Sequence, residues 1–227
     1  VIEVGETAVC NLASINLSNH VKVRTVDWKK LKETVEVAVR GLDNVIDLNF
    51  YPTEEARNSN LKNRPVGLGV MGTHDVLHKL SINYNSQEAV DLCDRLQEFI
   101  SLHAIKTSSL LAKEKGTYPT FGGSEWDKGN LPIDTYCELI NQRNPIKVPT
   151  ATISYIQGCS QSIEPDYSVL YVYSTLSGEF TMVNEHFVKI AKKRGLWSQA
   201  LVDALKSVDG DVSGLVNLDE DIKEEFV

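Results

Sequence analysis

Two long segments with apolar residues at helical spacing flank a short apolar segment, and this arrangement limits the fold more than any other feature. The first runs from about Trp28 to Leu48 and has Asp27 as its expected N-cap. The second begins at Asn85 in a variant of the capping box and ends at Gly116. Between them, residues 66–70 predict a short buried strand. Strands separated by long amphipathic helices indicate an α/β architecture with a largely parallel sheet.

The second half of the chain carries shorter patterns. The sequence TISYI, Thr152 to Ile156, is typical of a strand, and residues 168–183 predict a hairpin that turns near Ser177 and Gly178. Asn184 is the expected N-cap of a helix through Lys193. Residues 196–227 are expected to be helical at both ends, with a loop between the two helices.

Composition excludes several classes of protein. The 227 residues can bury one large core or two small ones. The 31 acidic and 23 basic residues give a formal charge of -8, and there is no basic run, so a nucleic-acid polymer is disfavoured as a partner while free nucleotides remain possible. The sequence contains neither a long apolar run nor a secretion signal. We therefore expect a cytoplasmic protein without a membrane partner.

The sequence GLGVMG, Gly67 to Gly72, fits the G-x-G-x-x-G pattern of dinucleotide-binding turns. Such a turn follows a buried strand, but residues 54–65 are polar and end in a proline. An NAD-binding oxidoreductase is therefore a disfavoured alternative. The preferred interpretation is a short strand in which Gly67 and Gly69 admit close neighbours, while Gly72 opens the following helix.

Patterns for metal or redox sites are weak. The cysteines form no C-x-x-C pair, which predicts neither a zinc site nor a disulfide scaffold, and each is expected to be a small buried side chain, with Cys10 the possible exception. His74 and His78 have the i, i+4 spacing of a metal pair, but no third ligand is recognisable nearby. A polar helix face is the favoured interpretation of the two histidines. The four cysteines are Cys10, Cys93, Cys137 and Cys159.

The sequence PTATIS, Pro149 to Ser154, places Thr150, Thr152 and Ser154 beside small residues. A turn of this composition can offer backbone N–H groups and hydroxyls to an anion. It can equally satisfy its own backbone, and composition favours this second interpretation.

Several segments together resemble the large, catalytic subunit of ribonucleotide reductase, most closely its class I branch. They occur in the order found in that family and cover most of the chain. They are CNLASINLS (Cys10 to Ser18), RPVGLGVMG (Arg64 to Gly72), GTYPTFGGSEWDKGNLPIDTY (Gly116 to Tyr136), PTATISYIQGCSQSIEP (Pro149 to Pro165) and SGEFTMVN (Ser177 to Asn184).

The resemblance implies a fold and a chemistry. The family fold is a ten-stranded α/β barrel made of two parallel halves, and residues 1–227 are expected to form a single partial domain, about five mostly parallel strands with flanking helices. In the family, a thiyl radical removes the 3′ hydrogen of a ribonucleotide and the 2′ hydroxyl leaves as water. Two cysteines supply the electrons by closing a disulfide.

The resemblance also implies site residues. Cys10 is similar to one of the two reducing cysteines, whose partner is expected upstream of Val1. The implied substrate site, which cradles the phosphates mainly through backbone N–H groups at a turn into a helix, comprises Thr150, Ala151, Thr152, Ile153 and Ser154.

The implied partners are a ribonucleotide, a radical-generating small subunit, a second large subunit, and thioredoxin or glutaredoxin. No cofactor is expected within residues 1–227; the radical would come from the metal-containing small subunit in class I or from adenosylcobalamin in class II. The family's radical cysteine is not found in this sequence, and a helix of the family is replaced by a short stretch between Leu139 and Pro149. We therefore expect no turnover from this segment alone. A degenerate or split reductase piece that only binds a partner chain is the main alternative.

Overall fold

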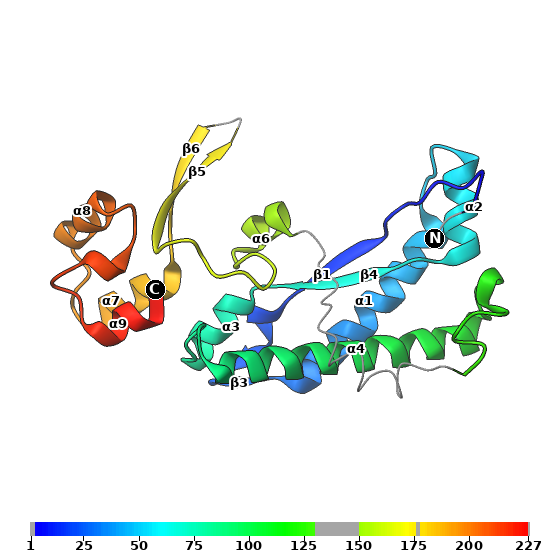
Figure 1. The fold of residues 1–227 in the computed structure, drawn as a ribbon, viewed down its shortest axis with the longest axis horizontal. Helices are drawn as coiled ribbons and strands as arrows, with labels where there is room; N and C mark the ends of the chain where they lie inside the picture. Colours follow the sequence, from blue (N-terminus) through cyan, green and yellow to red (C-terminus); the bar gives the residue numbers. More distant parts are fainter. Residues whose placement is uncertain (1–2, 130–149, 176–177, 227) are drawn as a thin grey trace.

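The computed structural model describes residues 3–129, 150–175 and 178–226. Figure 1 shows an elongated molecule in which α7, α8 and α9 form one end and α2 lies at the other. The N-terminal elements are β1 (Leu12–Asn16), η1 (Leu17–His20), β2 (Val21–Lys22), β3 (Thr25–Val26), α1 (Trp28–Leu48), α2 (Glu54–Asn63), β4 (Gly67–Met71), α3 (Thr73–Leu80), α4 (Gln87–Lys115) and η2 (Pro119–Phe121). The C-terminal elements are α6 (Ala151–Gln157), β5 (Leu170–Thr175), β6 (Gly178–Val183), α7 (Glu185–Lys193), α8 (Gln199–Ser207), η3 (Val212–Gly214) and α9 (Glu220–Phe226).

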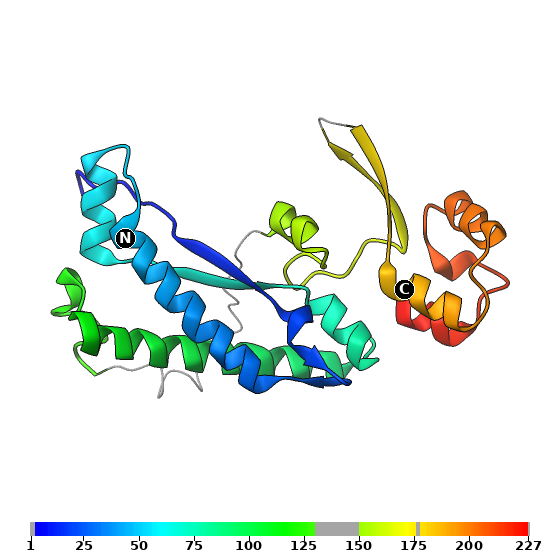
Figure 2. The ribbon, with the colours of Figure 1, turned by 180° about the vertical axis from the view of Figure 1, so that it is seen from behind.

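The first long helix forms as its sequence predicts. The Asp27 side chain caps α1 by accepting a hydrogen bond from the Lys30 N–H at 3.0 Å, an arrangement that stabilises a helix by about 1 kcal/mol. The predicted apolar stripe is the buried face of α1, and it comprises Leu31, Val35, Val39, Leu42 and Ile46. This face packs with α4 beneath β1 and β4, as Figure 2 shows from behind.

The second long helix begins one residue later than expected. Ser86 rather than Asn85 is its N-cap, because the Ser86 hydroxyl accepts from the Ala89 N–H at 3.2 Å. The Asn85 N–H is instead bonded to the Asn83 side chain in the preceding turn. Gly116 ends α4, as predicted.

The strands differ from the predicted largely parallel sheet. In the described part of the chain they form three two-stranded sheets, of which only the β1–β4 pair is parallel. Its register places Leu12 opposite Gly67 and Asn16 opposite Met71. The described residues therefore form a mixed α/β segment, as expected, but with small sheets and no closed barrel in place of about five mostly parallel strands. One strand of that expectation, Thr152 to Ile156, is part of helix α6 instead.

A glycine ends the α6 segment and explains its helical form. Gly158 adopts the left-handed conformation, with φ of 62°, and its N–H bonds back to the carbonyls of Ser154 and Tyr155. Such a C-cap closes a helix efficiently. The Ser154 side chain is fully buried, so packing and capping outweigh the β preference of Thr152 and Ile153.

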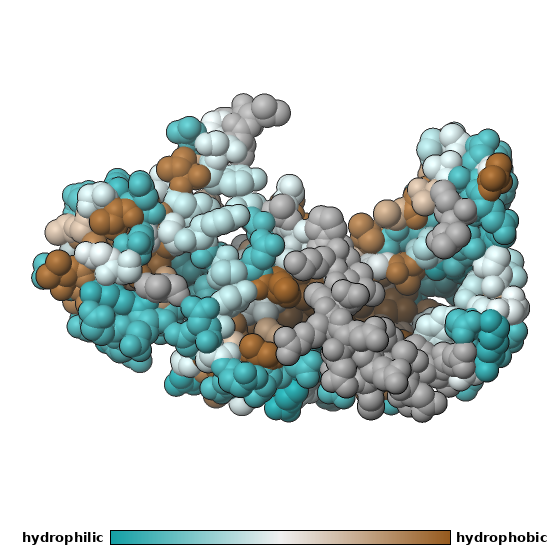
Figure 3. All heavy atoms as spheres, in the orientation of Figure 1, coloured by the Kyte–Doolittle hydropathy of each residue, from teal (hydrophilic) through white to brown (hydrophobic). Residues whose placement is uncertain are grey.

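The predicted hairpin is confirmed as β5 and β6, which pair antiparallel. It leads into a second hydrophobic cluster, separate from the α1–α4 cluster, in which Phe187 and Leu205 are completely buried. Asn184 caps α7 through its side-chain oxygen, as predicted. Figure 3 shows that hydrophobic side chains also reach the surface among hydrophilic ones. The exposed examples include Phe50, Ile156, Val172 and Phe180.

Candidate functional site

Cys10 lies two residues before β1 and its side chain is exposed. The neighbouring Asn11 is buried, and its Nδ2 donates to the Pro65 carbonyl at 2.9 Å while its own carbonyl accepts from the Gly67 N–H at 2.9 Å. The amino end of β1 is thus held against β4. These hydrogen bonds fix the backbone next to the exposed Cys10 thiol. An accessible thiol is one of the two requirements for a redox cysteine, a partner thiol being the other.

The glycine-rich motif is not a nucleotide-binding turn. Gly67 and Gly69 lie within β4, where they pair with β1, and helix α2 rather than a strand precedes them. Gly72 precedes α3 with φ of +77°, and a Cβ on it would lie 2.9 Å from the Asn16 Oδ1. The preferred interpretation of GLGVMG as a short strand followed by a helix is confirmed.

The sequence PTATIS leads into the amino end of α6. Thr150 is its N-cap and is buried, and Thr152 and Ile153 lie in the first turn with exposed side chains. The first backbone N–H groups of a helix have no partner within that helix, so this turn presents donors suited to an anion. Pro149 and the short stretch before it lie outside the described residues.

The segment after α6 packs against the carboxyl ends of β1 and β4. The Gly72 N–H donates to the Ser160 carbonyl at 2.8 Å, and the Thr73 hydroxyl donates to the Ser162 carbonyl at 3.0 Å. Figure 1 shows α6 beside this end of the parallel pair. Ligands of open α/β sheets bind at the carboxyl ends of the strands. Cys10 lies beyond the amino end of β1.

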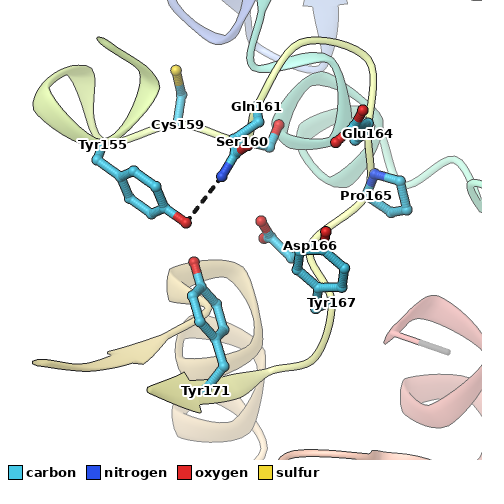
Figure 4. A pocket seen from close by; sticks show the side chains of 9 residues that line it. All are labelled: Tyr155, Cys159, Ser160, Gln161, Glu164, Pro165, Asp166, Tyr167 and Tyr171. Atoms are coloured by element: carbon cyan, nitrogen blue, oxygen red, sulfur yellow. Dashed lines mark hydrogen bonds between the residues drawn. The ribbon is translucent and has the colours of Figure 1, made fainter. Parts of the chain in front are cut away.

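A small polar cavity lies beside α6, with a volume of about 20 Å³. That volume suits a single water molecule. Figure 4 shows the hydroxyls of Tyr155 and Tyr171 pointing toward each other across it, and the Gln161 Nε2 donates to the Tyr155 hydroxyl at 2.9 Å. Burial, with Asp75 and Asp166 nearby, raises the pKa of the Cys159 thiol at its edge to about 11, so this group is a protonated thiol at neutral pH.

A buried cluster of titratable side chains connects α3 to the C-terminal helices. The Asp75 Oδ1 accepts from the His186 Nε2 at 2.9 Å, and its Oδ2 accepts from the Ser160 N–H at 2.6 Å. Burial opposes ionisation of this carboxyl, but the His186 and Ser160 hydrogen bonds outweigh it and lower the pKa of Asp75. Burial, and then the charge of Asp75, raises the pKa of Asp166.

The histidine pair does not lie on a polar helix face, which corrects the sequence interpretation. His74 and His78 are both buried, and their ring centroids lie 4.2 Å apart. His78 also stacks on His186 and Phe226, at 4.9 and 4.7 Å. Among the described residues no group of three or more potential ligands could hold a metal ion, and no described helix is long and apolar enough to cross a membrane.

Sequence reasoning missed Asp75, His186 and Ser162 at this site. They come from α3, α7 and the segment between α6 and β5, so no spacing in the sequence connects them. Cys93 and Cys159 are half-buried thiols rather than fully buried ones, and Cys137 lies outside the described part of the chain.

His74 predicts acid sensitivity of the fold. Burial, and then the charge of His78, lowers the pKa of His74 from 6.5 to about 3. Between these values the proton binds to this ring only in the unfolded chain. The contribution of His74 to the free energy of unfolding is therefore fully present above about pH 6.5, and it falls by up to about 1.4 kcal/mol per pH unit below that value. In urea titrations from pH 7 to pH 4.5, His74→Gln should lack this share of the decline. The matched change His103→Gln, at a less buried ring on α4, should keep most of the decline in stability. Equal slopes of unfolding free energy against pH for the wild type and His74→Gln would contradict the prediction.

The chain is similar to one protein family over almost its whole length. A family described as "Ribonucleotide reductase, barrel domain" matches residues 3–227. The chain is 46% identical over 254 residues to the ribonucleoside-diphosphate reductase subunit alpha of Chlamydia pneumoniae, covering 98% of this chain and 24% of that protein. It is 39% identical to the vitamin B12-dependent ribonucleoside-diphosphate reductase of Thermoplasma acidophilum, covering 96% of this chain and 28% of the relative.

A solved structure is similar to this chain in its fold. The alpha subunit of the Actinobacillus ureae class Id ribonucleotide reductase superposes with a TM-score of 0.68 at 24% identity, over 98% of this chain and 39% of that one. The chain spans about a quarter of the length of the curated relatives it matches. The chain therefore belongs to the ribonucleotide reductase family, as a segment of the barrel domain of the large subunit.

Proposed function

We propose that residues 1–227 contribute, as one partial barrel domain, to the catalytic centre of a ribonucleoside-diphosphate reductase, with Cys10 as one of its two reducing thiols. The observation that carries the proposal is the exposed Cys10 thiol at the amino end of β1, within a chain that matches the barrel domain from residue 3 onward. As the resemblance implies, the second thiol comes from a segment upstream of Val1.

The proposed reaction replaces the 2′ hydroxyl of a ribonucleotide by hydrogen. The C–O bond breaks, the oxygen leaves as water, and two thiols give up two electrons and two protons as they close a disulfide. A thiyl radical elsewhere in the protein removes the 3′ hydrogen and returns it. Cys10 therefore supplies one electron and one proton per turnover, and an external dithiol of the thioredoxin or glutaredoxin class must reduce the disulfide again.

We assign the substrate phosphates to the first turn of α6. Thr150, Ala151, Thr152 and Ile153 would contribute backbone N–H groups, and the exposed Thr152 side chain would add a hydroxyl. Ser154 is fully buried beneath the turn, so it supports the turn more than it contacts the ligand.

The remaining partners follow from the family. A radical-generating small subunit is the preferred source of the radical, because the chlamydial relative at 46% identity is an alpha subunit, whereas the relative at 39% uses vitamin B12. A second large subunit completes the assembly. In this proposal, the residues of the chain take part by binding substrate and donating electrons.

Calorimetric titration of the chain with CDP and ADP tests the phosphate turn. Thr152→Asp places a carboxylate beside the proposed phosphate position and should weaken nucleoside diphosphate binding by about tenfold or more through repulsion. Thr25→Asp adds the same charge to the exposed strand β3 and should leave binding unchanged. Equal affinity of wild type and Thr152→Asp would remove the turn from the substrate site.

A further inference from the structure

The first turn of α6 depends on another segment for its position. With seven residues, α6 is too short to be stable alone. The Thr150 hydroxyl does not cap the turn; its Oγ1 instead accepts a hydrogen bond from the Ser162 N–H at 2.8 Å. The placement of the turn therefore follows the placement of residues 159–162, which we call the support segment.

The support segment is in turn fixed to the start of α3. Gly72 and Thr73 donate to its carbonyls at Ser160 and Ser162, at 2.8 and 3.0 Å. The third contact, from the Ser160 N–H to the Asp75 Oδ2, is the shortest of the three at 2.6 Å and has a charged acceptor. Hydrogen bonds to a charged group are about twice as strong as neutral ones.

Asp75 is itself held in place by α7. Its second oxygen accepts from the His186 Nε2 at 2.9 Å, so each carboxylate oxygen has one donor, and the two donors come from different elements. The Asp75 and His186 side chains are both largely buried, at 17% and 14% exposed. An amide in place of the carboxylate carries no charge and has a single acceptor oxygen. Because a neutral His186 ring can accept from the amide NH₂, the expected change is the loss of the charged acceptor for the Ser160 N–H.

We propose that Asp75 and His186 are positioning residues for the phosphate-binding turn, acting through the Ser160 N–H, the support segment and the Ser162–Thr150 hydrogen bond. The proposal rests on the proposed function of α6. It assigns the two side chains no contact with substrate. Their role is to fix the direction of the first-turn N–H groups.

Two variants test the relay in the 227-residue chain. Asp75→Asn weakens its first link and Thr150→Val breaks its last, and each should weaken CDP binding by about tenfold. The weaker binding of cytidine, followed by NMR titration, should be unchanged. Thr150→Ser keeps the acceptor and should restore CDP affinity. Glu225→Gln is the matched control, because Glu225 faces His78 in the same cluster, at 3.5 Å, and its side chain lies outside the relay.

Amide hydrogen exchange separates this proposal from the proposed function. Asp75→Asn should speed exchange at Ser160 and Ser162 by about tenfold, and Glu225→Gln should not. Unchanged exchange at Ser162 in Asp75→Asn, or an equal loss of cytidine and CDP affinity, would overturn the relay. If Thr152→Asp leaves CDP binding intact while Ser162 exchange responds to Asp75→Asn, the relay stands and the assignment of phosphate to α6 fails.

Discussion

Replacing Cys10 by serine is expected to abolish deoxyribonucleotide formation in a reductase that carries residues 1–227 in place of its own barrel segment. The Chlamydia pneumoniae subunit alpha is a suitable host, since it is 46% identical across 98% of this chain. A serine hydroxyl cannot close a disulfide, so the two electrons needed for each deoxynucleotide are not available. The measurement is deoxycytidine diphosphate formed from CDP, with the host's small subunit and an excess of dithiol.

The control for Cys10 is Cys93→Ser. Cys93 is a half-buried thiol on α4, and burial raises its pKa, so it is a weak nucleophile and its loss should leave turnover intact. Wild-type turnover in the Cys10→Ser chimera would exclude Cys10 as a reductant. The chimera with Cys10 unchanged could also be inactive although its host is active without the exchange. That result would favour the alternative in which the chain is a degenerate or split reductase piece that only binds a partner chain.

Helices were predictable where the signals were local. The α1 stripe, its Asp27 cap and the Gly116 end of α4 depend on residues within a few positions of one another. The same holds for the β5–β6 hairpin and for Asn184 at α7. In each case a local hydrogen bond or a regular apolar spacing agrees with the tertiary packing, so sequence and structure coincide.

Sequence patterns failed where burial, a helix cap or pairing between distant residues decides the outcome. The β-branched residues of α6 predict a strand, but the buried Ser154 and the left-handed Gly158 favour a helix. His74 and His78 have a polar appearance in sequence, yet both are buried, and His78 packs against α7 and α9. The predicted parallel sheet depends on pairings between distant strands, which no local spacing specifies.

The site divides in the same way. Composition alone favoured ordinary roles for Cys10 and for Thr150, and only the resemblance to reductases gave them chemical roles. The structure adds the exposure of Cys10 and the helical start beside Thr150. Asp75 and His186 could be found only in three dimensions, because 111 residues separate them.

Gly210→Ala is expected to be the most destabilising single substitution proposed for the C-terminal cluster. Gly210 has φ of +78°, and a Cβ there would lie 2.0 Å from the Leu170 carbonyl oxygen and 2.7 Å from the Leu170 nitrogen. These are backbone atoms of β5, so no side-chain rotation relieves the overlap. The left-handed strain and the displacement of β5 together should cost roughly 3–5 kcal/mol.

Chemical denaturation of Gly210→Ala and Gly214→Ala measures this difference. Gly214 lies four residues further on, in η3, and a Cβ there meets no atom within 4 Å, so its substitution should change stability by less than about 0.5 kcal/mol. Similar stabilities for the two variants would contradict the close approach of Gly210 to β5. Because α7 carries His186 and packs in the same cluster through Phe187, loosening that cluster should also speed exchange at the Ser160 amide. The packing of the C-terminal helices would then set the position of the proposed phosphate turn on α6, through Asp75.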